Sequence, residues 1–115
     1  MTAEALSKII IKGMEEKKAS DISILDLRDI KNSVSDFFIL CSGNSSTQLE
    51  AIADSIEEEV YKSGEKGHGQ REGKNSGQWI LMDYVNVVAH IFIKEKRDHF
   101  GLEDLWGDAK ITKIK

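Results

Sequence analysis

The sequence predicts an α/β fold, of the α+β kind, in which helices pack against a mixed β-sheet. Apolar residues recur at helical spacing in two segments, near the N-terminus and after Ser45. Short runs rich in β-branched and aromatic residues predict strands between and after them. The expected order is helix, strand, strand, helix, β-hairpin and helix, which places helices against a sheet. With 115 residues, we expect one domain that spans residues 1–115.

The first half of the chain should contain a helix and two strands. Residues 3–17 carry apolar positions on one helical face, and Thr2 is suited to cap that helix. Residues 22–27 (ISILDL), bounded by Ser20-Asp21 and Arg28-Asp29, predict a strand, and residues 29–36 should connect it to the next. Residues 37–41 (FFILC) are apolar without alternation, which indicates a central strand buried on both faces.

The second half should contain a helix, a loop, a hairpin and a final helix. Ser45 and Gln48 form a capping box for a helix that stops near Gly64. Residues 64–78 hold five glycines and no large apolar residue before position 79, so we expect a loop. Residues 79–83 and 87–93 should pair as a hairpin around a tight turn at Val85-Asn86.

The expected register gives the two faces of this hairpin different characters. One face is uniformly apolar and suits the core, with Ile80, Met82, Tyr84, Val87, Ala89 and Ile91. The other face mixes large apolar side chains with one acid and one imidazole: Trp79, Leu81, Asp83, Val88, His90 and Phe92. Such a mixture is typical of a binding patch, because a core rarely holds an unpaired carboxylate. Alternatively, the C-terminal helix covers this face, and His90 is then a structural residue.

Composition and motifs argue against several classes of function. The net charge of −4 disfavours non-specific nucleic-acid binding and fits a basic partner or simple solubility. The single cysteine, Cys41, is read as a small buried hydrophobe rather than a reactive thiol. The histidines lack metal-ligand spacing, and no complete phosphate loop or carboxylate pair is found, so we expect no metal, no cofactor and no catalysis. No export signal or membrane span is evident, which favours the cytoplasm.

Several motifs in one order resemble the ribosomal silencing factor family, also called Iojap-like. They cover most of the chain, from about residue 4 to residue 109: KASDI with LDL, DFFI leading to SGNS, AIAD, WILMDY, VVAHIF and LEDLWGDA. The chain departs from the family at Val85-Asn86, where Gly-Asp is usual, and at Phe100, where tyrosine is usual. A β-branched residue at a tight turn is awkward, so the turn is where this chain should differ.

The resemblance implies a nucleotidyltransferase-like fold without catalytic acids. It also implies a translational repressor that binds the fourteenth protein of the large ribosomal subunit and blocks joining to the small subunit. The partner-binding residues it implies are Trp79, Leu81, Asp83, Tyr84 and His90, although Tyr84 belongs to the opposite face in the expected register. A homodimer is implied as well, and the tail at 102–109 is the other candidate for the binding surface.

Two other classes of function remain open at this point. One is a small nucleotidyltransferase-like enzyme or nucleotide-binding domain that uses Asp36 or Asp83. The other is a purely structural oligomerisation module.

Overall fold

The structure is a computed structural model that describes residues 2–31, 33, 35–64, 69–74 and 77–114. Its helices are α1 (Ala3–Glu16), α2 (Ser46–Lys62), the 3₁₀ turn η1 (Lys94–Lys96), α3 (Arg97–Phe100) and α4 (Leu102–Leu105). Its strands are β1 (Ser20–Asp26), β2 (Phe37–Gly43), β3 (Gln70–Lys74), β4 (Trp79–Asp83), β5 (Val87–Ile93) and β6 (Lys110–Lys113).

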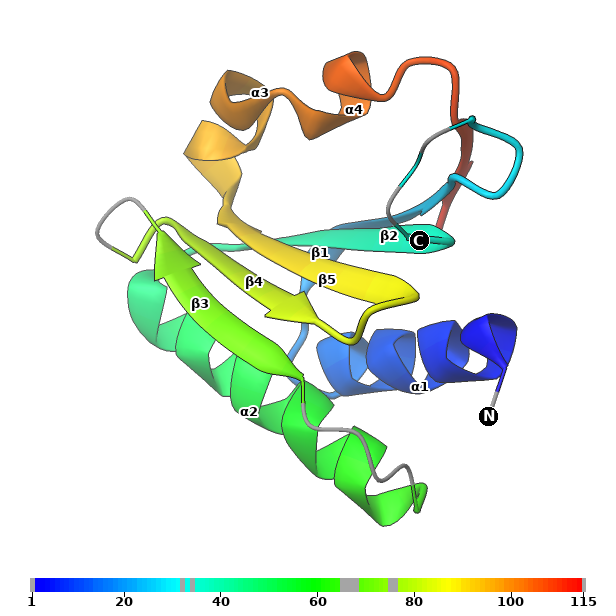
Figure 1. Ribbon diagram of the computed structural model, residues 1–115. Helices are drawn as coiled ribbons and strands as arrows, with labels where there is room; N and C mark the ends of the chain where they lie inside the picture. Colours follow the sequence, from blue (N-terminus) through cyan, green and yellow to red (C-terminus); the bar gives the residue numbers. More distant parts are fainter. Residues whose placement is uncertain (1, 32, 34, 65–68, 75–76, 115) are drawn as a thin grey trace.

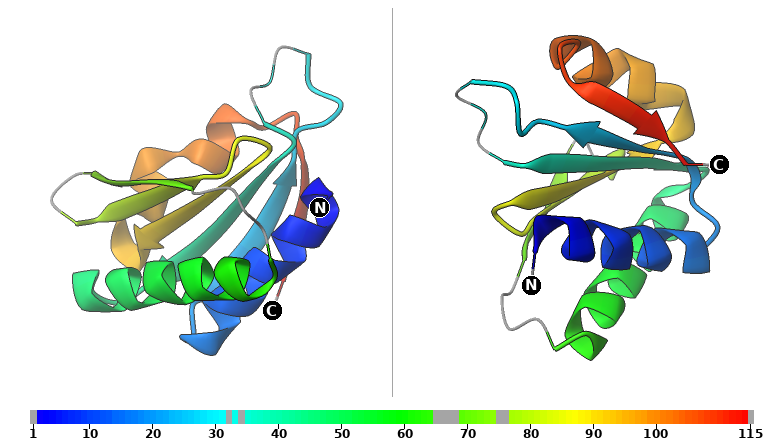
Figure 2. Two further views of the ribbon diagram at one scale, coloured as in Figure 1. Left: turned by 60° about the horizontal axis from the view of Figure 1, so that its bottom comes forward. Right: turned by 90° about the vertical axis from the view of Figure 1, so that its right-hand side faces the viewer.

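The six strands form one mixed sheet with the order β3-β4-β5-β2-β1-β6. Among the strands of the described residues, only the central pair, β2 and β5, is parallel, and the other pairs are antiparallel. The helices α1 and α2 cover one face of the sheet, and the short helices α3 and α4 lie over the other (Figures 1 and 2). The expected α+β architecture is therefore confirmed.

Local sequence explains why the two long helices begin where they do. The Thr2 hydroxyl accepts the Ala5 N–H at 3.0 Å, and the Ser45 hydroxyl accepts the Gln48 N–H at 3.1 Å. The Gln48 side chain accepts the N–H of Asn44, one residue before the cap, at 2.7 Å. These bonds satisfy backbone donors that a helix start leaves without an intrahelical partner.

The core lies on both faces of the sheet, as two clusters. The first cluster packs β2, β4 and β5 against α1 and α2, with side chains such as Ile10, Ile52 and Ile91 fully buried. The second cluster lies under residues 94–109, which we call the C-terminal segment, and includes Leu40 and Phe92. All seven residues of β2 are buried, which confirms the predicted central strand. No helix in the described part of the chain is long and apolar enough to cross a membrane.

Two edge strands were not predicted. Strand β3 lies inside the stretch 64–78 that was expected to be a loop, and β6 lies where a terminal helix was expected to continue. Both strands are polar and mostly exposed, so neither shows the alternation that burial of one face imposes. Their backbones pair with β4 and β1, and these contacts override local composition. Residues 65–68 and 75–76 of the expected loop lie outside the described residues.

The C-terminal helical segment is also shorter and more broken than predicted. Gly101 separates α3 from α4 with a φ of 62°, and its N–H donates to the carbonyl of Arg97. A left-handed residue ends a helix because it turns the chain out of the helical path. The result is a set of short turns that lies across the second cluster (Figure 1).

Candidate functional site

The hairpin formed by β4 and β5 has the register that the sequence predicted. Ile80 pairs with Ile91 and Met82 with Ala89, while Leu81 pairs with His90. The apolar face of the hairpin therefore joins the first cluster beneath α1 and α2. The mixed face turns toward the C-terminal segment on the other side of the sheet.

At the Trp79 end, the mixed face is covered. The Trp79 indole packs against Phe100 at 4.9 Å and Phe92 at 5.2 Å between ring centroids. Its Nε1–H donates to Nδ1 of His90 at 3.1 Å. Trp79 remains only half-buried, whereas His90 is buried. The alternative interpretation, in which the C-terminal helix covers this face, therefore agrees with the structure at this end, where His90 accepts the hydrogen bond of Trp79.

At the Asp83 end, the mixed face is open. A hollow of about 300 Å³ lies there, which we call the hairpin hollow, and it is lined by Ser35, Phe38, Leu81, Asp83, Val85, Val88 and His90. Its walls are mainly apolar, and Asp83 supplies the carboxylate. The Oδ1 atom of Asp83 accepts the N–H of Val85 at 2.7 Å, which ties the acid to the turn. The hollow can take a partner side chain that is apolar along its length and cationic at its tip.

Tyr84 points to the opposite side of the sheet. It packs partly against the first cluster, and its ring lies so close to Gly69 that a Cβ there would come within 2.7 Å of it. Burial raises the pKa of the Tyr84 phenol to about 12. The structure thus brings Leu81, Asp83 and His90 to one hollow, places Trp79 beside it, and separates Tyr84 from it.

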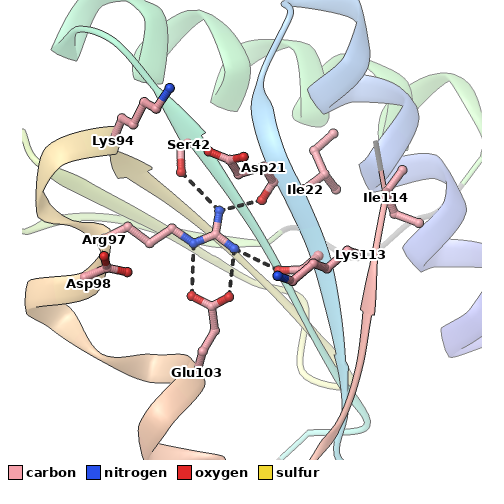
Figure 3. A pocket seen from close by; sticks show the side chains of 10 residues that line it. Asp21, Ile22, Ser42, Lys94, Arg97, Asp98, Glu103, Lys113 and Ile114 are labelled. Atoms are coloured by element: carbon pink, nitrogen blue, oxygen red, sulfur yellow. Dashed lines mark hydrogen bonds and ion pairs between the residues drawn. The ribbon is translucent and has the colours of Figure 1, made fainter.

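A second, larger pocket of about 560 Å³ lies between the C-terminal segment and the other end of the sheet (Figure 3). Arg97 fills its centre and donates to both carboxylate oxygens of Glu103 at 3.1 and 3.2 Å. It also donates to the hydroxyls of Ser23 at 2.8 Å and Ser42 at 3.1 Å, and to the carbonyl of Asp21.

These contacts use all five N–H donors of the Arg97 guanidinium. The side chain links the start of α3 to α4, β1 and β2, so it fastens the C-terminal segment onto the sheet. We call this group the Arg97 clamp. Sequence reasoning missed it, because an arginine in the charged run KEKRDH carries no local sign of burial.

A nucleotidyltransferase would need the Ser42-Gly43 turn that leads into α2 to lie beside an acid such as Asp83, and the structure keeps the two apart. Ser42 and Gly43 lie at the carboxyl end of β2, whereas Asp83 pairs with Val88 near the amino end of β5, which runs parallel to β2. Phe92, the partner of Ser42, lies four residues beyond Val88 along β5, so the two groups are roughly 13 Å apart along the strands. Among the described residues, no group of three or more histidine, cysteine, aspartate or glutamate side chains is placed to hold a metal ion.

A family model described as "Ribosomal silencing factor during starvation" matches residues 1–115. The chain belongs to the ribosomal silencing factor family. The resemblance inferred from the sequence motifs is therefore confirmed.

Individual relatives agree with this membership. The chain is 36% identical to a ribosomal silencing factor of Bacillus subtilis, over 99% of this chain and 95% of the relative. It is 33% identical to the chloroplastic protein Iojap of Zea mays, over 93% of this chain and 46% of that protein. A crystal structure of a Chromobacterium violaceum protein superposes with a TM-score of 0.83 at 32% identity, covering 93% of this chain and 88% of that one.

Proposed function

We propose that this ribosomal silencing factor represses translation by binding the large ribosomal subunit through its fourteenth ribosomal protein. Occupation of that surface would prevent the small subunit from joining. The observation that carries the proposal is the open hairpin hollow, in which Leu81 and Asp83 offer apolar area and a negative charge side by side. Membership of a family named for ribosomal silencing supplies the partner class.

The two faces of the sheet support the choice of surface. Helices α1 and α2 cover the first face and bury its apolar side chains. On the second face, Trp79, Leu81 and Asp83 stay half-buried at alternate positions of one strand. A half-buried aromatic and aliphatic row beside a charged group is how interface centres are commonly built.

Charge also favours a basic ribosomal protein as the partner. The chain carries a net charge of −4, and Asp83 lines the hairpin hollow. Complementary charges speed the encounter and orient the partners. We infer that the protein acts in the cytoplasm, where subunits join. A homodimer remains a prediction, to be checked by measuring the mass of the purified protein in solution.

Sedimentation of the purified protein with separated large and small subunits tests the proposal. We expect the protein to pellet with large subunits and not with small subunits, and to reduce the formation of joined ribosomes. Pelleting with neither subunit, or with small subunits only, would contradict the proposal.

A matched pair of variants tests the surface. Leu81→Ser removes apolar area from the hairpin hollow, and we expect about tenfold weaker binding, or ~1.4 kcal/mol. Tyr61→Ser is the control, because Tyr61 is 82% exposed on α2, on the other face of the sheet. Thermal melting of both variants shows whether they are folded. Equal binding by a folded Leu81→Ser variant would place the contact surface elsewhere, first of all at residues 102–109.

A further inference from the structure

The turn between β4 and β5 holds a β-branched residue in a left-handed conformation. Val85 has a φ of 74°, and the Asn86 N–H donates to the Tyr84 carbonyl, two residues back, at 3.0 Å. A positive φ with this bond is the geometry of the rarer, strained form of γ-turn. Valine is poorly suited to it, since its branched Cβ crowds the backbone there.

The surrounding contacts hold this turn in place. The Val85 N–H donates to Asp83, and the Val85 carbonyl accepts the Ser35 hydroxyl at 2.8 Å. The Asn86 carbonyl accepts the backbone N–H groups of Asp36 at 2.8 Å and Phe37 at 3.2 Å. Hydrogen bonds from Asp83 and from residues 35–37 therefore hold the backbone of the turn, and with it the direction of the Cα–Cβ bond of Val85.

That direction places an apolar side chain in solvent at the edge of the hairpin hollow. Val85 is 74% exposed and lines the hollow together with Leu81 and Asp83. In the isolated protein, valine gains little from burial here and bears the backbone strain. Glycine or asparagine would relieve the strain and expose less apolar surface. Strain kept at an exposed position indicates a role in binding.

We propose that Val85 and Asp83 form one subsite for a lysine or arginine side chain of the partner. Val85 packs against the aliphatic stem of that side chain, and Asp83 pairs with its cationic tip. A carboxylate accepts more than one hydrogen bond, so Asp83 can hold the turn and bind the cation together. The apolar wall formed by Phe38, Leu81 and Val88 continues the surface that the stem would cover. This inference rests on the proposed function and assigns the specificity of the same surface.

The test compares four variants in binding to large ribosomal subunits at several salt concentrations. Val85→Gly and Val85→Asn relax the turn and remove the apolar tip. Asp83→Asn removes the charge but keeps an oxygen that accepts the Val85 N–H, so the turn is preserved. The fourth variant combines Val85→Gly with Asp83→Asn. Wild-type protein is the reference, and Tyr61→Ser is the control for loss of an exposed apolar side chain elsewhere.

We expect both Val85 variants to melt no lower than wild type and yet to bind about fivefold more weakly. Asp83→Asn should bind about tenfold more weakly at low salt, with a flatter dependence on salt. The double variant should lose less than the product of the two losses, because one ligand side chain contacts both residues.

Three outcomes would overturn the inference. One is binding by both Val85 variants within twofold of wild type. Another is a melting temperature more than about 5 °C lower in both, since the valine would then not be strained. The third is losses that multiply in the double variant. If wild-type protein does not bind large subunits, both the proposed function and this inference are contradicted. If Leu81→Ser loses binding while both Val85 variants bind like wild type, only this inference is contradicted.

Discussion

Replacement of Arg97 by methionine should destabilise the protein by about 3 kcal/mol. Breaking a buried ion pair by removing one partner typically costs 3–5 kcal/mol, because the other charge stays behind without compensation. The Arg97 side chain is 10% exposed, but that of Glu103 is 30% exposed, so water screens the carboxylate that remains. The lower end of the range is therefore expected. Urea unfolding followed by circular dichroism measures the loss.

A second variant separates the ion pair from packing. In the Arg97→Met, Glu103→Met double variant no buried charge is stranded, and we expect it to recover at least ~1 kcal/mol relative to the single variant. The Ser23 and Ser42 hydroxyls lose a donor in both variants, so their contribution cancels in the comparison. A loss below about 1 kcal/mol in the single variant, or a double variant less stable than the single one, would refute the clamp as a stabilising contact.

Other changes probe the core and its ionisable groups. Gly13→Ala should lower the free energy of unfolding in urea by about 1–3 kcal/mol, since a Cβ would lie 2.8 Å from the Ile56 Cα where α1 crosses α2. An unchanged unfolding midpoint would show that the two helices can move apart without a measurable loss of stability. Ile52→Ala should cost roughly 2–4 kcal/mol, because Ile52 is fully buried, and a loss under about 0.5 kcal/mol would contradict that burial. Burial raises the pKa of the Cys41 thiol to about 12, so alkylation at pH 8 should require unfolding, and rapid labelling of folded protein would argue against it. Because the unfolded thiol ionises first, Cys41 should lower stability as pH rises from about 9 toward 12, and Cys41→Ala should remove that part of the decline in alkaline unfolding curves.

The hairpin could be predicted in detail because its signals are local. Two strand-like runs flank a two-residue turn, and the expected register makes one of the two faces uniformly apolar. The resulting pairs, such as Met82 with Ala89, are those observed. The same logic places Trp79, Leu81 and Asp83 on one face and Tyr84 on the other, as the structure has them.

The edge strands could not be predicted because their partners, rather than their composition, make them strands. Arg71 in β3 illustrates the point: it forms ion pairs of 2.8–3.0 Å with Glu50, Asp54 and Glu57 along α2. These contacts tie the edge strand to the preceding helix, at residues 14 to 21 positions earlier in the sequence. A polar stretch rich in glycine gives no sign of this, since every such partner lies outside the local window.

By itself, the sequence determined the family, the central strand, the long helices and the two faces of the hairpin. These features depend on the spacing of apolar residues, which short-range geometry converts directly into burial. The tertiary structure alone decided which part of the mixed face stays open. Phe100 covers Trp79 and the Arg97 clamp secures that cover, while the turn leaves Asp83 half-buried and Val85 exposed at the hairpin hollow. Contacts between segments far apart in the chain set that boundary, and no local pattern encodes them.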